Sequence, residues 1–251
     1  MIRVVKIGGN VIDDPVLLGR FVQEFAALEG PKVLIHGGGA LASGMQRQLG
    51  MEPQLVQGRR VTDADTLRIV TMVYAGWCNK LIVSHLQAAG CNAAGFCGAD
   101  GDLIRCHRRA PLNGVDYGFV GDVDAVNATL LLQLLAAGVT PVLCAITHDG
   151  AGGLLNTNAD TIASSVAVAL AKEQACTLCY CFEKDGVLGA DGAVIPALSR
   201  ADFASLQAAG TVSAGMIPKL ETAFRAREAG VEAVRICHAT HLNDTIGTIL
   251  L

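Results

Sequence analysis

The sequence has few charged residues and no excess of positive charge. Charged side chains make up 17% of its 251 residues, against about 25% in an average globular domain, whereas hydrophobic ones make up 51%. This balance excludes a disordered chain and supplies apolar surface for a core. Because the formal charge is −4, no net basic field attracts nucleic acid, and an anionic ligand must be held by local cations and backbone N–H groups.

We expect neither a membrane-spanning helix nor a secretory leader. Residues 125–148 contain no Asp, Glu, Lys or Arg, but Gly138 and Pro141 divide this stretch into a helix and a strand. Met1 runs directly into an apolar strand, so we expect no leader. Nine cysteines, an odd number, indicate a reducing compartment in such a chain. We therefore expect a soluble, cytoplasmic protein.

Three of the cysteines lie close together in the sequence, at Cys176, Cys179 and Cys181. Their spacing invites a zinc interpretation, but no second matching pair follows. Cys179 and Cys181 fit alternate positions of a buried strand, so we interpret them as core thiols and expect no metal site.

Glycine, in contrast, is abundant: 29 residues, about 12%, against about 7% in an average protein. Two strand–glycine–helix junctions, at Gly8-Gly9 and at residues 37–39, expose backbone N–H groups where a helix begins, which suits phosphate or carboxylate. The Gly-Lys-Ser/Thr of P-loop enzymes is absent. Residues 37–42 match the dinucleotide fingerprint only loosely, which keeps a nucleotide-dependent dehydrogenase as an alternative.

Strand and helix patterns alternate along the whole chain. This alternation predicts one α/β domain with a mainly parallel central sheet and helices on both faces. Of the short strands expected at 93–97, 104–108 and 117–123, two are expected to form an antiparallel hairpin. The principal strands are expected at 4–7, 32–36, 93–97, 140–145, 176–182, 233–237 and 248–251, and the helices at 13–28, 40–49, 62–89, 130–137, 158–172, 199–209 and 218–229.

Four charged positions stand at the ends of these elements. Lys6 ends an apolar strand, where a lysine is costly, and Lys219 lies at a helix start. Fixed positive charge of this kind favours phosphoryl transfer. Asp160, on the first turn of a helix, either satisfies the helix dipole or holds both lysines in place. Arg60, beside Arg59, either clamps a carboxylate or belongs to a solvated pair.

Taken together, six motifs resemble the amino-acid kinase family over residues 6–251. The first two mark the superfamily, and the third, fifth and sixth narrow it to kinases of acylated glutamate. The resemblance implies an open αβα sandwich in which residues 1–157 bind the acylated amino acid and residues 158–251 bind ATP. The motifs are KIGGN at 6–10, HGGG at 36–39, RVTD at 60–63, GADG at 98–101, NTNAD at 156–160 and GMIPK at 215–219.

The resemblance also implies a reaction and the residues that perform it. The γ-phosphoryl group of ATP, which carries Mg²⁺ with it, would pass to the side-chain carboxylate of N-acetyl-L-glutamate, or of N-succinyl-L-glutamate, in arginine biosynthesis. Lys6 and Lys219 would stabilise the transition state, and Asp160 would organise both. The acylated amino acid would be held by Gly38, Gly39, Arg60 and Asn156, and the phosphates and nucleotide by Gly8, Gly9, Glu183, Gly186, Ser213, Gly215 and Met216.

Two departures from the family pattern bear on specificity. Phe182-Glu183 stands where family members often carry Ser-Asp, which leaves the adenosine contacts open. Residues 54–58 lack the lysines common there, close to the acyl group, so both acyl groups stay open. A long helix beginning near Thr62 has surplus apolar positions and predicts a homodimer. The first strand starts at once, without the extra helix of relatives that arginine inhibits, so we expect insensitivity to arginine.

Other interpretations remain within and outside this family. A kinase of another small acid, such as aspartate, unacylated glutamate or carbamate, would use the same fold. A non-catalytic binding protein is disfavoured because Lys6, Asp160 and Lys219 are all present.

Overall fold

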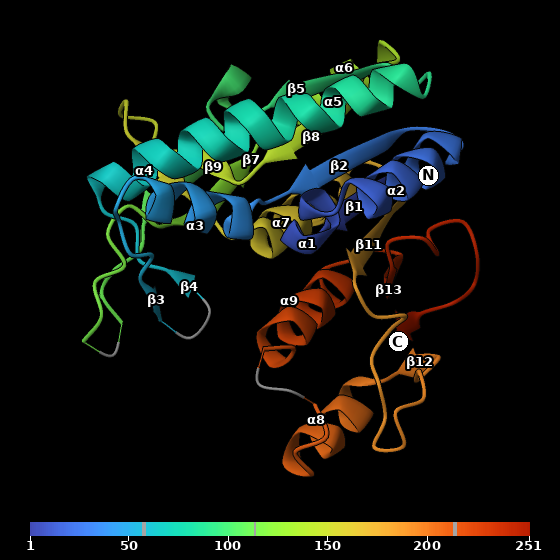
Figure 1. Ribbon diagram of the computed structural model, residues 1–251. Coiled ribbons are helices and arrows are strands. Elements are labelled where there is room, and N and C mark those ends of the chain that lie inside the picture. Colours follow the sequence, from blue (N-terminus) through green and yellow to red (C-terminus); the bar gives the residue numbers. More distant parts are fainter. Residues whose placement is uncertain (57–58, 113, 213–214) are drawn as a thin grey trace.

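The computed structural model (Figure 1) describes residues 1–56, 59–112, 114–212 and 215–251, and its centre is an eight-stranded sheet. Six neighbouring strands are parallel, β14 is antiparallel to β13, and β12 pairs parallel with β14. The predicted α/β fold with a mainly parallel sheet is confirmed. In spatial order the strands are β12 (Ala197–Leu198), β14 (Thr248–Leu250), β13 (Ala233–His238), β11 (Cys176–Phe182), β1 (Ile2–Ile7), β2 (Lys32–His36), β8 (Thr140–Cys144) and β5 (Ala93–Phe96).

The central strands form because their apolar residues are buried on both faces of the sheet. Every residue of β2 and β8 is buried, and β1 is buried at five of its six positions. Such continuous apolar runs are typical of parallel strands covered by helices on both sides.

One helical layer is centred on α7 (Ala159–Ala171), which packs on β1, β2 and β11 and contacts α6 (Ala128–Ala136) and α9 (Ile217–Glu228). Asn158 caps α7 by accepting hydrogen bonds from the N–H groups of Asp160 and Thr161. Phe224 of α9 stacks on Phe203 of α8 (Arg200–Ala208), with ring centroids 5.6 Å apart.

The other layer contains α5 (Asn79–Ala88), which packs on β5 and β8 and contacts α2 (Pro15–Ala27). Beside it, α3 (Gly39–Gln48) contacts α1 (Gly9–Asp13) and α4 (Ala64–Thr71). The long helix expected from Thr62 is present as α4, η1 (Met72–Cys78) and α5, but its middle segment η1 is π-helical. A π-helical turn inside an α-helix commonly lies at a functional site.

A smaller four-stranded sheet, in the order β10-β9-β6-β7, adjoins the central one. An antiparallel hairpin between two of the expected short strands is confirmed: β6 (Ile104–Arg108) pairs with β7 (Gly121–Val126), which overlaps the strand expected at 117–123 but begins four residues later. The sequence did not predict β9 (Ile146–His148), β10 (Leu154–Asn156), the 3₁₀ turn η2 (Asp100–Asp102), or the pair β3 (Leu55–Val56) and β4 (Arg59–Arg60). Two or three residues are too few for a period to emerge.

No helix in the described ranges is long and apolar enough to cross a membrane.

Candidate active site

The structure brings the predicted catalytic residues Lys6, Asp160 and Lys219 together around one aromatic ring. Lys6 ends β1, and its Nζ lies 2.8 Å from Oδ1 of Asp160 at the start of α7. Both side chains are about nine-tenths buried. The ring of Phe182, at the end of β11, lies 4.9 Å from the Lys6 Nζ and 4.1 Å from the Lys219 Nζ. Each ammonium therefore faces the negative surface of the same ring.

Lys219 differs from Lys6 in having no carboxylate within ion-pair distance among the described residues. Burial lowers the pKa of Lys219, and the nearby Lys6 lowers it further, whereas Asp160 and Glu183 act in the opposite direction. Two ammonium groups share one buried carboxylate here, so positive charge is in excess. A bound anion would remove that excess.

The two glycine junctions lie side by side next to this charge cluster. A Cβ added to Gly9 would lie 3.7 Å from the backbone nitrogen of Gly39, and one added to Gly37 would lie 3.8 Å from the Cβ of Ala159. Gly38 has φ +152°, and a Cβ there would lie 2.8 Å from the Cys78 sulfur. The turn into α3 thus needs glycine at position 38 for both conformation and space.

A buried histidine holds this second glycine turn. The Nδ1 of His36 lies 2.8 Å from the Gly37 carbonyl oxygen, to which it donates, and its Nε2 accepts from the Asn79 amide at 3.1 Å. Asn79 also donates to the carbonyl of Val142 at 3.0 Å. Burial lowers the pKa of His36 to about 4. His36 is therefore neutral near pH 7, and its tautomer is set by these two partners.

Arg60 is buried and held in place by residues of α3. Its guanidinium donates to the side chain of Gln46, to Ser43 Oγ at 2.6 Å and to the Gly39 carbonyl at 2.8 Å. These bonds use three of its five N–H donors and fix the plane of the guanidinium. The interpretation of Arg60 as one of a solvated pair is wrong, although its neighbour Arg59 is exposed.

Arg60 faces a cavity of about 210 Å³, here called the arginine cavity. Four predicted substrate-binding residues, Gly38, Gly39, Arg60 and Asn156, all line it. The Asn156 amide donates to Thr62 Oγ1 at 3.0 Å, which fixes the orientation of its side chain. The other lining residues are Gly37, Leu55, Arg59, Tyr74, Arg109, Val120, Ala145, Thr157, Asn158 and Ala159.

The sequence did not single out Tyr74 and Arg109 as cavity residues. Arg109 is held by a two-pronged ion pair with Asp122, whose carboxylate is the main cause of the raised pKa of Arg109. It also lies over the ring of Tyr117, 5.8 Å from its centroid. Tyr74 has the apolar spacing of a core residue, and the structure places it in the π-helical segment η1, at the cavity wall.

Besides Gly8 and Gly9, the residues predicted to bind nucleotide belong to two segments, 183–188 and 211–216. Their described residues, 183–188, 211–212 and 215–216, are here called the nucleotide-side turns. Glu183 is exposed and accepts a hydrogen bond from Asn10, and Gly215 is an exposed residue just before α9, with Met216 as its N-cap. Gly186 packs against β14, where a Cβ would lie 2.7 Å from Thr248 Oγ1. Ser213 lies outside the described residues.

One expected phosphate donor is already engaged inside the protein. The N–H of Gly8 donates to the Cys181 carbonyl at 3.1 Å as part of the sheet. Gly9 begins α1, and the first N–H groups of a helix have no partner within it. At this junction Gly9 is therefore better placed than Gly8 to meet a ligand.

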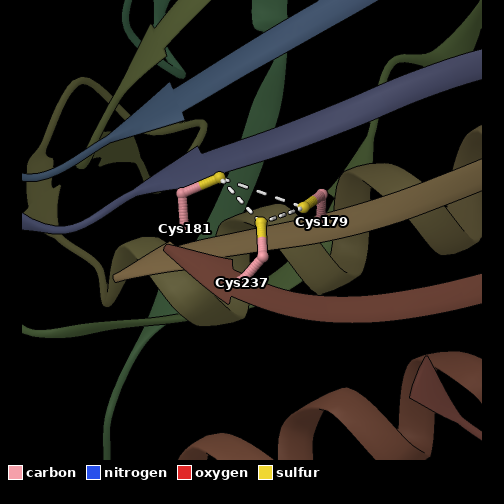
Figure 2. Close-up of side chains that lie close together, drawn as sticks. All are labelled: Cys179, Cys181 and Cys237. Carbon is pink, nitrogen blue, oxygen red and sulfur yellow. Dashed lines mark hydrogen bonds between the residues drawn. The ribbon is translucent and has the colours of Figure 1, made fainter. Parts of the chain in front are cut away.

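The three cysteines that the sequence groups together separate in the structure. Cys176 is not part of any group, whereas Cys179 and Cys181 approach Cys237 of β13 (Figure 2). Cys237 is 56 residues away from Cys181 along the chain, so sequence spacing gave no signal for it.

The class of this protein follows from its family match. The model of the amino acid kinase family matches residues 1–238, and the chain belongs to that family. Among curated relatives, the chain is similar to acetylglutamate kinases: it is 50% identical to that of Bacteroides thetaiotaomicron over 250 residues, covering 98% of this chain and 97% of the relative. The acetylglutamate kinase of Chloroflexus aurantiacus is 40% identical over 244 residues, covering 97% and 94%.

Solved structures share the fold. A Streptococcus mutans protein is 28% identical with a TM-score of 0.81, covering 99% of this chain and 98% of that one. The N-acetylglutamate synthase from Neisseria gonorrhoeae, complexed with coenzyme A and N-acetyl-glutamate, is 23% identical with a TM-score of 0.86. The match covers 99% of this chain but 59% of the synthase chain, and at this identity it concerns the fold alone.

Proposed function

We propose that this chain is an enzyme that phosphorylates the side-chain carboxylate of N-acetyl-L-glutamate with ATP, a step of arginine biosynthesis. Relatives named acetylglutamate kinase match it over nearly its full length. The observation that carries the proposal is the position of the arginine cavity directly beside the Lys6–Asp160 pair. Its wall includes Asn158 and Ala159, the two residues before Asp160. A substrate whose α-carboxylate is held by Arg60 would thus have its side-chain carboxylate, the group that reacts, near the lysines.

In this reaction, an oxygen of the substrate side chain attacks the γ-phosphorus, and the bond from that phosphorus to the β–γ bridging oxygen breaks. Negative charge spreads over the transferred group. Lys6 and Lys219 would neutralise that charge, and Asp160 with the Phe182 ring would hold both ammonium groups in position, a role that their short mutual distances support. Arg60 and Asn156 would bind the α-carboxylate and the acylated amide end of the substrate.

We propose that Mg²⁺ arrives bound to the phosphates of ATP. The carboxylate of Asp160 is engaged by Lys6, and Glu183 accepts from Asn10. Magnesium is commonly held through substrate phosphates and few protein oxygens. The residues near the lysines fit this mode of binding, which does not require a protein cage of carboxylates.

The arginine cavity also bears on the acyl group. Arg109 is paired with Asp122, but Arg59 forms no ion pair with any described residue. A succinyl group adds one carboxylate to the substrate, and Arg59 is a cation available to meet it. N-succinyl-L-glutamate is therefore the second candidate substrate.

A substrate panel tests both candidates. Acyl phosphate formed with ATP is trapped by hydroxylamine for N-acetyl-L-glutamate, N-succinyl-L-glutamate, free glutamate, aspartate and carbamate. We expect the acylated glutamates to exceed free glutamate at least about 100-fold in kcat/KM, since unpaired buried polar groups reject truncated substrates. Equal or greater activity with an unacylated acid would overturn the proposal. Arg59→Ala should raise the KM for the succinyl substrate and leave that for the acetyl substrate unchanged.

We further propose a cytoplasmic homodimer joined through the long helix. Met72 and Trp77 of η1 are about 60% and 64% exposed, and Trp77 borders an apolar hollow with Leu41 and Met45 of α3. Such a surface is typical of a protein contact. Light scattering of the wild type and of Trp77→Lys should give a dimer and a monomer.

All nine cysteines are free, which agrees with a reducing compartment.

A further inference from the structure

We propose that Cys179, Cys181 and Cys237 form a binding site for a single copper(I) ion, on the face of the sheet away from the catalytic lysines. Cys179 and Cys181 share one face of β11, and Cys237 lies directly opposite Cys181 on β13. Figure 2 shows the three sulfur atoms converging. The proposal does not depend on the kinase activity.

The distances between the sulfur atoms fit one central ion. Cys179 and Cys237 are 3.4 Å apart, and Cys181 is 3.9 Å from each of them. Three sulfurs bound at about 2.3 Å to an ion in their plane would lie about 4.0 Å from one another. Binding therefore needs Cys179 and Cys237 to move apart by about 0.6 Å, and the other two distances to change by about 0.1 Å.

A neighbouring arginine supplies positive charge. Arg235 lies opposite Cys179 on β13, and its guanidinium is close to the sulfurs of Cys179 and Cys237. It donates to the carbonyls of His241 and Asp244, which holds it in place. Its buried Nε has no hydrogen-bond partner in the described part of the chain. Three thiolates around a monovalent ion carry a charge of −2, and Arg235 offsets half of it.

The ligand set selects the ion. Thiolates prefer soft ions, and copper(I) is the softest of the common ones. Zinc in a structural site takes four ligands, whereas this group offers three within the described residues. Cys181 and Cys237 are buried, and Cys179 is partly exposed, which gives an entry path. On binding, the ion displaces the thiol protons to solvent and undergoes no change in oxidation state.

The test titrates the reduced, full-length protein with copper(I) in competition with a chromophoric chelator, without oxygen. We expect one equivalent bound, with a thiolate-to-copper absorption band and three sulfurs at about 2.3 Å by X-ray absorption. Cys237→Ser and Cys179→Ser should each weaken binding more than about 100-fold, and Arg235→Gln about 10-fold. Cys176→Ser, in the same strand but outside the group, is the matched control.

Thermal unfolding of each variant identifies any that fail to fold. If a serine variant fails to fold, Cys179→Ala is measured in its place. Binding that is equal in Cys237→Ser and Cys176→Ser would overturn the proposal, as would no bound copper. So would a four-coordinate zinc ion bound in preference to copper(I).

Discussion

The arginine cavity and the nucleotide-side turns flank the same lysines but differ in how their residues are held. In the cavity, Arg60 makes three hydrogen bonds to α3, and Asn156 and Arg109 are each fixed by a partner. On the nucleotide side, Glu183 and Gly215 are exposed. The cavity is preorganised before a ligand arrives, whereas these two residues on the nucleotide side face solvent. Specificity for the amino acid should therefore reside in fixed polar groups.

The largest effect should come from the lysines between the two regions. Lys6→Ala and Lys219→Ala should each lower kcat about 100- to 1000-fold, about 3–4 kcal/mol, with a smaller change in KM, because fixed charge acts mainly on the transition state. Steady-state kinetics measure this, with exposed Lys172→Ala as the control. A variant with normal kcat and raised KM would place its lysine in one binding region rather than between them.

The pH dependence of stability tests how firmly the cavity is built. An unfolded chain binds a proton on His36 below about pH 6.5, but the folded protein, in which burial lowers the pKa of His36 to about 4, does so only near pH 4. The contribution of neutral His36 to the free energy of unfolding is therefore complete above pH 6.5. It is lost as the pH falls from 6.5 to 4, about 3 kcal/mol in all. The free energy of unfolding, measured with urea, should change more steeply with pH in this window for the wild type than for His36→Gln. Equal slopes would contradict a neutral, buried His36.

Arg60 should act on binding. Arg60→Ala should raise the KM for the amino acid about 30-fold or more, about 2 kcal/mol, since a buried charge partner is lost. Arg60→Lys should not restore it, because an ammonium cannot replace the planar fork that bonds Gln46, Ser43 and Gly39. The KM for ATP should stay within about twofold, and Arg68→Lys, on an exposed helix face, is the control. Unchanged affinity in Arg60→Lys would remove this residue from the substrate site.

The smallest effect concerns the glycine turn. Gly38→Ala should cost about 1–3 kcal/mol of stability and raise the KM for the amino acid, because φ is +152° and a Cβ would meet Cys78 and Tyr74. Gly19→Ala, inside α2 with nothing within 4 Å of its Cβ, should instead stabilise the fold by up to about 1 kcal/mol. Chemical denaturation compares the two. If both variants behave alike, the turn is not as tightly built as its contacts indicate.

Periodicity predicted the long elements and the parallel sheet, and motifs predicted the residues that meet at the cavity and at the Lys6–Asp160 pair. The residues that hold these site residues in place could not be predicted from the sequence. Gln46 and Ser43 hold Arg60 from α3, but both look like ordinary polar residues of a helix. Arg109 reaches the cavity from the segment just after β6, and Cys237 reaches Cys181 from the next strand. Contacts of this kind depend on tertiary pairing, which single-sequence patterns do not encode.

The π-helical segment η1 also restricts how many residues the chain can have between Thr71 and Asn79. Tyr74 lines the cavity and Asn79 bonds His36, so both ends of this segment are tied to fixed partners. Removing one residue from 72–78 would let the helix return to ordinary bonding, because a π-helical turn holds more residues than an α-helical one. The remaining residues of the segment would then be redistributed around the axis, and Tyr74 would lose the turn that sets it at the cavity wall. Natural variants of this protein should consequently gain and lose residues in the surface turn at 189–193 and keep a constant count between Thr71 and Asn79.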